Sequence, residues 1–225
     1  MRGGYTVEHA EISSEQLRLE ANLDTKLAIV NALDTLMGKT SLDRLGVNHI
    51  CEAAGVSRAT FYRCFRDKFD VVEWFLRFLS AKGTDRIGKT LSWYEGYFIS
   101  EALIMDNVHF FTSAAKSDDA NSLDRIAPRI RRDRIFRTLT NDRGVEVTQR
   151  LRIQVNSVVL TETYLFPAWH NGKYDATLEE VCTWMCECIP QELFNLLNTP
   201  LKPQDPSAPA PASGGPGQPP RTPRQ

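Results

Sequence analysis

A short segment of this chain combines residue types that can bind duplex DNA. Residues 57–68 carry four basic side chains and one acidic side chain, so their charge sums to +3 (four minus one). At about 100° per residue, a helix here would place four residues on one arc of about 140°: Arg58, Ala59, Tyr62 and Arg63. Arginine can donate two hydrogen bonds to a guanine edge, a tyrosine hydroxyl can bind a phosphate, and alanine allows the backbone to approach closely. The segment is therefore predicted to be a recognition helix for the major groove.

The neighbouring residues can form the turn that positions such a helix. Residues 47–54 have the hydrophobic period of a short helix, and Gly55 can adopt the left-handed conformation of a sharp turn. Ser57 is a favourable N-cap for the second helix, and Phe61 lies beside the basic arc, where it can pack into a core. The pattern predicts a helix-turn-helix at about residues 46–65. A helical hairpin with a solvated basic face is the alternative interpretation.

The same stretch resembles a known protein family. Residues 46–72 contain Ile50-Cys-Glu-Ala-Ala-Gly-Val-Ser-Arg-Ala-Thr-Phe-Tyr-Arg-Cys-Phe-Arg-Asp-Lys-Phe-Asp, which resembles the DNA-binding domain of the TetR family of bacterial transcriptional regulators. The resemblance extends back through residues 23–37, which would form the first helix of that domain. It implies an all-α homodimer in which three N-terminal helices bind operator DNA, while a variable C-terminal domain dimerises and usually binds a small ligand.

The resemblance also implies which side chains contact DNA. By position, Asn48, Arg58 and Ala59 would face the bases, and Arg63 would reach either a base or the backbone. The other members of the DNA-binding set lie near the phosphate backbone or cap the recognition helix: Ser57, Thr60, Tyr62, Cys64 and Lys68. Val47 stands where the family often has threonine, so no hydroxyl contact with phosphate is assigned there.

Helical patterns dominate the rest of the chain and predict an all-α fold. Apolar residues recur every three or four positions, and the predicted helices beyond the helix-turn-helix span residues 23–37, 68–82, 91–105, 108–115, 122–140, 146–170 and 177–198. Residues 154–160 alone carry a short, ambiguous strand pattern. The predicted organisation is an N-terminal arm (1–20), a helix-turn-helix DNA-binding domain (21–82), a helical ligand-binding and dimerisation domain (83–198) and a disordered Pro-rich tail (199–225).

Composition limits the classes of protein to consider. Hydrophobic residues make up 42% of the chain and charged residues 24%, so a sizeable core can form. Lys and Arg number 27 against 28 Asp and Glu, a net charge of −1, so a DNA-binding surface must be local. No apolar stretch approaches the roughly 18 residues of a membrane span, and the N-terminus lacks a signal-peptide core. Five scattered cysteines suit reduced thiols, so we expect a cytoplasmic protein.

Two groups of apolar residues in the C-terminal half are candidates for binding. Trp93, Tyr97, Phe110 and Phe111 could line an effector pocket, although a helical core has the same composition. By resemblance of layout, the last two predicted helices would supply the dimer interface through Val155, Val158, Val159, Leu165, Val181, Trp184, Met185, Ile189, Leu193, Leu196 and Leu197. Six arginines between residues 125 and 137 are interpreted as a solvated helix face, or else as an anion or DNA contact.

Two further motifs leave other chemistry open. Residues 83–90, Gly-Thr-Asp-Arg-Ile-Gly-Lys-Thr, match the P-loop pattern of a small nucleotide-binding enzyme. No apolar strand precedes them, so a loop between helices is favoured. Cys182, Cys186 and Cys188 could bind zinc or sense redox state, but packing at a helix seam also explains them. No other enzyme motif or metal-ligand spacing is found, so we predict no catalytic residue, no metal and no cofactor.

Together, these patterns and the resemblance predict a sequence-specific DNA-binding transcriptional regulator that acts as a ligand-released homodimeric repressor. Its expected partners are double-stranded operator DNA, an unknown small-molecule effector and a second copy of the chain, with no membrane. A helical adaptor that uses its Pro-rich tail, where nine of the twelve prolines lie, is the remaining alternative.

Overall fold

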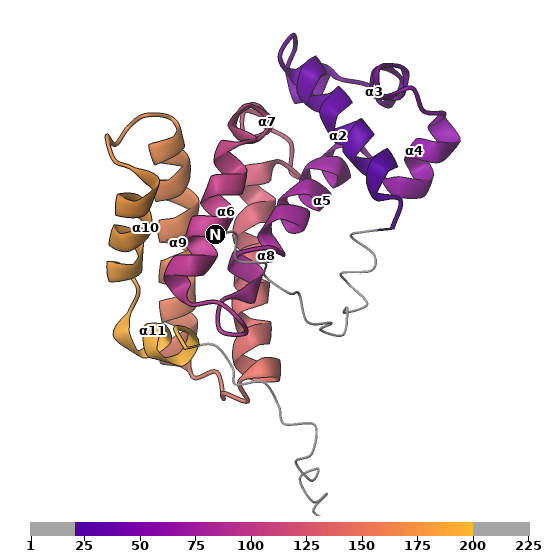
Figure 1. Ribbon diagram of the computed structural model, residues 1–225. Coiled ribbons are helices and arrows are strands. Elements are labelled where there is room, and N and C mark those ends of the chain that lie inside the picture. Colours follow the sequence, from indigo (N-terminus) through magenta and orange to yellow (C-terminus); the bar gives the residue numbers. More distant parts are fainter. Residues whose placement is uncertain (1–20, 200–225) are drawn as a thin grey trace, which may run out of the picture.

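The computed structural model describes residues 21–199 and is built from helices (Figure 1). In chain order these are α2 (Leu23–Met37), α3 (Val47–Ala54), α4 (Arg58–Cys64), α5 (Lys68–Ser80), α6 (Trp93–Met105), α7 (Val108–Ala114), α8 (Leu123–Arg137), α9 (Gln149–His170), α10 (Leu178–Glu187) and α11 (Gln191–Leu197). No β-strand occurs in these residues, so the all-α prediction is confirmed. Within the same range, no helix has the length and apolar character needed to cross a bilayer. The predicted arm (1–20) and the tail from residue 200 onwards lie outside the described residues.

The first hydrophobic core holds α2, α3, α4 and α5 together. The apolar stripe predicted over residues 23–37 forms α2 with those bounds, and its Ile29 and Leu33 are fully buried. Helix α5 begins directly after Asp67, the predicted N-cap. The Asp67 carboxylate accepts a hydrogen bond of 2.8 Å from the Asp70 N–H and thereby caps the helix. These helices form one end of the molecule, with α5 leading from them into the larger body (Figure 1).

Helix α7 closes this first core, although it follows α6 in the chain. The rings of Phe110 and Phe111 lie 5.0 and 5.5 Å from the ring of Phe75 on α5, measured between centroids. On the neighbouring surface, His109 Nδ1 lies 2.7 Å from Asp34 Oδ1 on α2. A helix from the second half of the chain therefore covers the helices of the first half.

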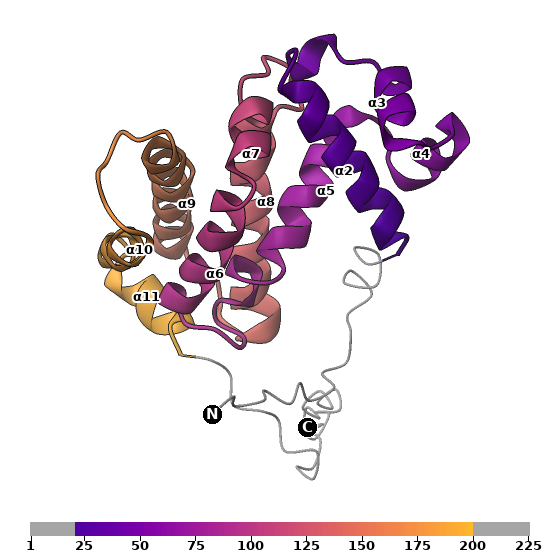
Figure 2. The same cartoon turned by 45° about the horizontal axis from the view of Figure 1, so that its top comes forward.

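The second core lies between α6, α8, α9, α10 and α11, with α9, α10 and α11 on the side away from α2–α4 (Figure 2). Eight of the eleven residues predicted for a dimer interface are buried here, inside one subunit: Val155, Val158, Val159, Val181, Met185, Ile189, Leu193 and Leu197. For these eight the prediction is wrong. Periodicity reveals that a helix has an apolar face, but it does not tell whether that face packs within the subunit or against another one.

Two predicted helices have different limits in the structure. The single helix predicted over residues 177–198 is divided into α10 and α11 at Pro190. Proline lacks the N–H that a helical hydrogen bond requires, and its ring disfavours a helical conformation of the preceding residue. The helix predicted over residues 122–140 ends earlier, where α8 passes into a π-helical turn at Thr138–Asp142.

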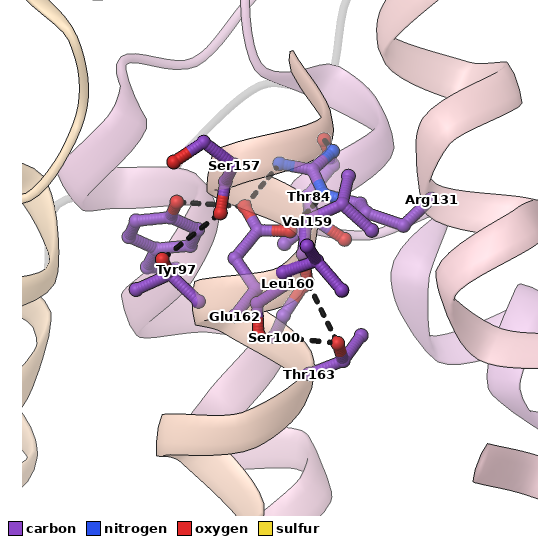
Figure 3. Close-up of polar contacts among 10 residues, drawn as sticks. Thr84, Tyr97, Ser100, Arg131, Ser157, Val159, Leu160, Glu162 and Thr163 are labelled. Atoms are coloured by element: carbon purple, nitrogen blue, oxygen red, sulfur yellow. Dashed lines mark hydrogen bonds and ion pairs between the residues drawn. The ribbon is translucent and has the colours of Figure 1, made fainter. Parts of the chain in front are cut away.

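A buried polar network joins α6, α8 and α9 within the second core (Figure 3). Arg131 donates to both carboxylate oxygens of Glu162, from Nε at 2.8 Å and from Nη2 at 3.0 Å, and its Nη1 donates to the Thr84 carbonyl at 3.1 Å. The Tyr97 hydroxyl donates to the same carboxylate at 2.7 Å. Burial by itself would lower the pKa of Arg131, but the charge and hydrogen bonds of Glu162 outweigh it. The net effect raises the pKa of Arg131, so the guanidinium stays charged.

The prediction of a solvated arginine face on α8 is wrong for two of its members. The side chains of Arg131 and Glu162 are only 12% and 7% exposed. Arg134 Nε lies 3.0 Å from Asp85 Oδ2, and these two side chains are 13% and 10% exposed. Helix α8 packs against both α5 and α9, so a row of arginines on it faces neighbouring helices as well as solvent.

Candidate nucleic-acid interface

The turn between α3 and α4 has the predicted geometry. Gly55 follows α3 with φ 66° and ψ 29°, in the left-handed region that glycine tolerates without strain. The Ser57 Oγ accepts a hydrogen bond of 3.1 Å from the Thr60 N–H and thereby caps α4. Phe61 has no exposed surface and anchors α4 in the first core. The predicted helix-turn-helix and the roles of these three residues are confirmed.

The basic arc of α4 points away from the core. Arg58, Ala59, Tyr62 and Arg63 are exposed, and nearly half of the Tyr62 surface is accessible (48%). Helices α3 and α4 lie at the outer end of the molecule, away from α6 and α8–α11 (Figure 2). The arc is therefore a surface that a partner can reach.

Asn48 on α3 and Arg58 on α4 contact each other, because Arg58 Nη1 donates a hydrogen bond to Asn48 Oδ1. The Arg58 guanidinium carbon also lies 5.6 Å from the centre of the Tyr62 ring. Of the residues predicted to lie near the DNA backbone, Thr60 and Cys64 are half-buried at the edge of this surface. The structure thus brings two of the predicted base-facing residues, Asn48 and Arg58, into contact and leaves Thr60 and Cys64 less accessible.

Lys68 has a different setting from the one predicted for a phosphate contact. Its Nζ donates to the backbone carbonyls of Asp43 at 2.7 Å and Leu45 at 3.0 Å. Two of its three ammonium hydrogens are therefore used inside the domain, where they fasten the segment before α3 to the start of α5. Backbone carbonyl partners leave no trace in residue types, so sequence analysis could not find them.

We expect Lys68→Met to lower the free energy of unfolding by about 1.5 kcal/mol, because two carbonyls lose a charged donor. Chemical denaturation followed by circular dichroism measures this loss. Lys39→Met, which removes the same group from an exposed position after α2, should leave stability unchanged. Wild-type stability of Lys68→Met together with a shallower salt dependence of DNA binding would instead identify Lys68 as a phosphate contact.

Sequence analysis missed the polar contacts that fix the DNA-binding helices to the second half of the chain. The Ser117 hydroxyl, after α7, hydrogen-bonds to the carboxylate of Asp43, which lies in the 3₁₀ turn Leu42–Arg44 before α3. His109 and Asp34 form the second such contact. The partners are 74 and 75 positions apart, and none of these residues belongs to a motif. A single sequence therefore carries no signal for them.

The four aromatic residues predicted to line an effector pocket do not share a cavity. Phe110 and Phe111 pack in the first core, whereas Trp93 and Tyr97 pack in the second, and all four are buried. An open groove of about 390 Å³ lies elsewhere, between α6, α10 and α11. It is lined by Tyr94, Thr183, Cys186, Glu187, Ile189, Gln191 and Phe194.

Residues 83–90 form a loop between α5 and α6, as the favoured interpretation held. The segment follows a helix instead of a strand and contains a 3₁₀ turn at Thr84–Arg86. Lys89, which would reach a nucleotide phosphate in a P-loop, lies 3.1 Å from Asp142 Oδ2. The strand–loop–helix arrangement that cradles phosphates is absent from this part of the described chain.

The three C-terminal cysteines differ in their surroundings. Cys182 is buried, Cys186 is half-buried and Cys188 is exposed. Burial raises the pKa of Cys182 to about 12 and that of Cys186 to about 11. Both thiols are therefore protonated at neutral pH, and a protonated thiol is a poor nucleophile and a poor metal ligand. Within residues 21–199, no three His, Cys, Asp or Glu side chains are grouped so that they could hold a metal ion.

We expect iodoacetamide at pH 7.5 to alkylate Cys188 at least about 100-fold faster than Cys182, because the buried thiol is both inaccessible and protonated. Mass spectrometry of peptides from timed samples measures the two rates. The same reaction in denaturant serves as the control and should label all five cysteines. Equal rates for Cys182 and Cys188 in the folded protein would contradict the burial of Cys182.

The glycine turn, the capped and exposed basic helix behind it, and the helical body that carries them define a DNA-binding regulator of the helix-turn-helix class. Residues 29–73, from within α2 to within α5, match the family described as "Bacterial regulatory proteins, tetR family". Over these residues the chain carries the DNA-binding domain of the TetR family of transcriptional regulators. This match supports a DNA-binding transcriptional regulator.

Two solved structures match most of this chain. The dihydroxyacetone kinase operon activator DhaS is 12% identical, with 79% of this chain and 99% of that chain covered and a TM-score of 0.53, which indicates a shared fold. A tetR-family transcriptional regulator from Streptomyces coelicolor is 16% identical, with 77% and 86% covered and a TM-score of 0.48. No curated protein sequence matches this chain significantly.

Proposed function

We propose that this regulator is a homodimeric repressor that binds a near-palindromic operator and releases it when a small molecule binds. The outward basic face of α4, anchored by the buried Phe61, is the observation that carries the proposed DNA contact. The residues proposed to form the DNA interface are Asn48, Ser57, Arg58, Ala59, Thr60, Tyr62, Arg63 and Cys64, while Lys68 is chiefly structural. In a dimer, two α4 helices would enter successive major grooves, about 34 Å apart.

The proposed dimer surface is the outward face of α9. Ile153, Leu160 and Tyr164 are spaced by seven and four residues, so they form one stripe, and they are 64%, 66% and 59% exposed. Trp184 on α10 is 49% exposed. Exposed apolar patches of this kind mark interaction sites, and a twofold dimer brings the same face of each subunit together.

Release by a ligand is proposed to act through α7 and α8. Helix α7 closes the core of the DNA-binding helices, and α8 packs against α5. A small molecule has room in the groove between α6, α10 and α11. If it favours a conformer in which α7 or α8 is displaced, the separation of the two α4 helices changes, and operator affinity falls. A coupling of about 1–3 kcal/mol, or about 5–150-fold, is typical of such systems.

The proposal is tested by selecting duplexes from a random pool with the full-length protein and measuring affinity against salt concentration. We expect enrichment of a near-palindrome bound at least about 1,000-fold more tightly than random DNA. Replacing Arg58 and Arg63 by alanine should abolish this preference. Replacing Arg125 and Arg129 of α8 by alanine removes two exposed arginines outside the interface, and this double variant should keep the preference for the enriched duplex. Failure to bind any duplex at low ionic strength would contradict the proposal.

Two further measurements separate the remaining parts of the proposal. Removing residues 200–225 should leave operator binding intact, whereas a helical adaptor that acts through these residues would lose its function. A reporter gene placed behind the enriched operator should be less transcribed when the regulator is present. Higher transcription in its presence would show activation in place of repression.

A further inference from the structure

Three side chains of the helix-turn-helix form a unit around the Arg58 guanidinium. Arg58 Nη1 donates to Asn48 Oδ1 on α3, and the guanidinium carbon lies 5.6 Å from the centre of the Tyr62 ring, one turn further along α4. A long side chain on an open surface ordinarily samples many rotamers. Contacts on two sides restrict this one, so Arg58 is placed before DNA arrives.

The hydrogen bond also fixes the direction of the Asn48 carboxamide. A guanidinium has only donors, so Asn48 must present Oδ1 to Arg58 and turn Nδ2 away. Asparagine recognises adenine by using its oxygen and its nitrogen together, on adenine N6 and N7. The contact with Arg58 occupies one of the two lone pairs of Oδ1 and sets the orientation of the Asn48 carboxamide. We therefore expect the effect of Asn48 on base preference to pass through Arg58.

Arg58 retains the donors that guanine requires. A guanidinium has five N–H donors, and Asn48 occupies one of them, so four are left. Guanine presents O6 and N7 in the major groove, and arginine binds both with two donors of its planar fork. Arg58 is the first residue of α4, and the N-terminal residues of a recognition helix are those that contact base edges.

We propose that Arg58 recognises one guanine in each operator half-site, and that Asn48 is a positioning residue that acts by holding Arg58. This inference rests on the proposed DNA-binding function, and it adds the identity of the base and the division of roles between the two helices. The test begins with wild-type protein and an enriched duplex. If no duplex is bound, the proposed function fails at that step, independently of the roles of these residues.

In the enriched duplex, each guanine is replaced in turn, in both half-sites, by 7-deazaguanine, which lacks the N7 acceptor but still pairs with cytosine. We expect one position at which wild-type protein loses about 10-fold or more in affinity. Arg58→Ala should bind more weakly overall and lose nothing further at that position. If wild type and Arg58→Ala are equally sensitive at every position, Arg58 does not bind guanine N7 and the proposal is wrong.

The role of Asn48 is tested by a double-variant cycle on the same two duplexes. Asn48→Ala should weaken binding to the unmodified duplex about 5–10-fold and to the 7-deazaguanine duplex less than about 2-fold. Asn48→Ala combined with Arg58→Ala should bind as Arg58→Ala alone does. Asn31→Ala makes the same chemical change at an exposed position of α2 and should alter nothing. Thermal melting establishes that every variant is folded.

Two results would overturn the positioning role. One is an equal loss for Asn48→Ala on both duplexes, and the other is simple addition of the Asn48 and Arg58 effects. Either result would show that Asn48 contacts DNA by itself.

Discussion

Replacing Arg131 by methionine is expected to lower the free energy of unfolding by about 3–5 kcal/mol. The change removes the guanidinium that neutralises the buried Glu162 carboxylate and that donates to the Thr84 carbonyl. Methionine keeps much of the side-chain volume, so the loss comes from the uncompensated charge and not from a cavity. In a chain of this size, the melting temperature should fall by about 6–20 °C, which calorimetry measures.

Two companion variants make this result specific. Arg125→Met removes an exposed arginine from the same helix and should change stability by less than about 0.5 kcal/mol. Combining Arg131→Met with Glu162→Met replaces the buried ions by an apolar pair and should recover much of the loss. A cost below about 1 kcal/mol for Arg131→Met, or losses that add in the double variant, would show that the pair contributes little to the second core.

Replacing Leu160 by aspartate is expected to raise the dissociation constant of the proposed dimer at least about 100-fold. Leu160 lies between Ile153 and Tyr164 on the exposed stripe of α9, and twofold symmetry would place the new carboxylate in the proposed interface twice. A 100-fold change corresponds to about 3 kcal/mol, which is within the cost of burying an unpaired charge. Sedimentation velocity at a series of concentrations measures the constant. Affinity for the complete operator should fall with it, whereas binding to a half-site should persist.

Met105→Asp provides the matched control for this prediction. Met105 is an exposed apolar residue at the end of α6, outside the α9 stripe, so its substitution should leave the proposed dimer intact. A Leu160→Asp protein that dimerises like wild type would place the dimer surface elsewhere. Equal weakening by both substitutions would indicate a general effect of added charge.

Short-range patterns in the sequence were sufficient to predict the DNA-binding end. Helices α2 and α3 have the expected bounds, and Gly55, Ser57 and Phe61 have the expected roles. Each of these features depends on residues within a few positions of one another, through backbone preference, capping or helical spacing. Pro190 is the local signal that pattern analysis underweights, because strong apolar periodicity continues on both sides of it.

Contacts between distant segments could not be predicted in this way. Arg131 and Glu162 are 31 positions apart, and their pairing depends on how α8 and α9 pack. The carbonyl partners of Lys68 depend likewise on where the segment before α3 passes α5. The placement of the aromatic residues in two separate cores could not be predicted for the same reason. A sequence shows that Phe110 and Trp93 are apolar, but it does not show which core each one enters.

The packing of α7 on α5 determines how this protein can be recombined with others. A chimera that joined residues 21–82 to a foreign sensor module would lose Phe110 and Phe111 and leave Phe75 without the rings that cover it. Such a hybrid would expose an apolar surface and aggregate, even though residues 21–82 form one continuous segment of the chain. Transplanting the operator-binding unit therefore requires carrying α7 along as a separate piece.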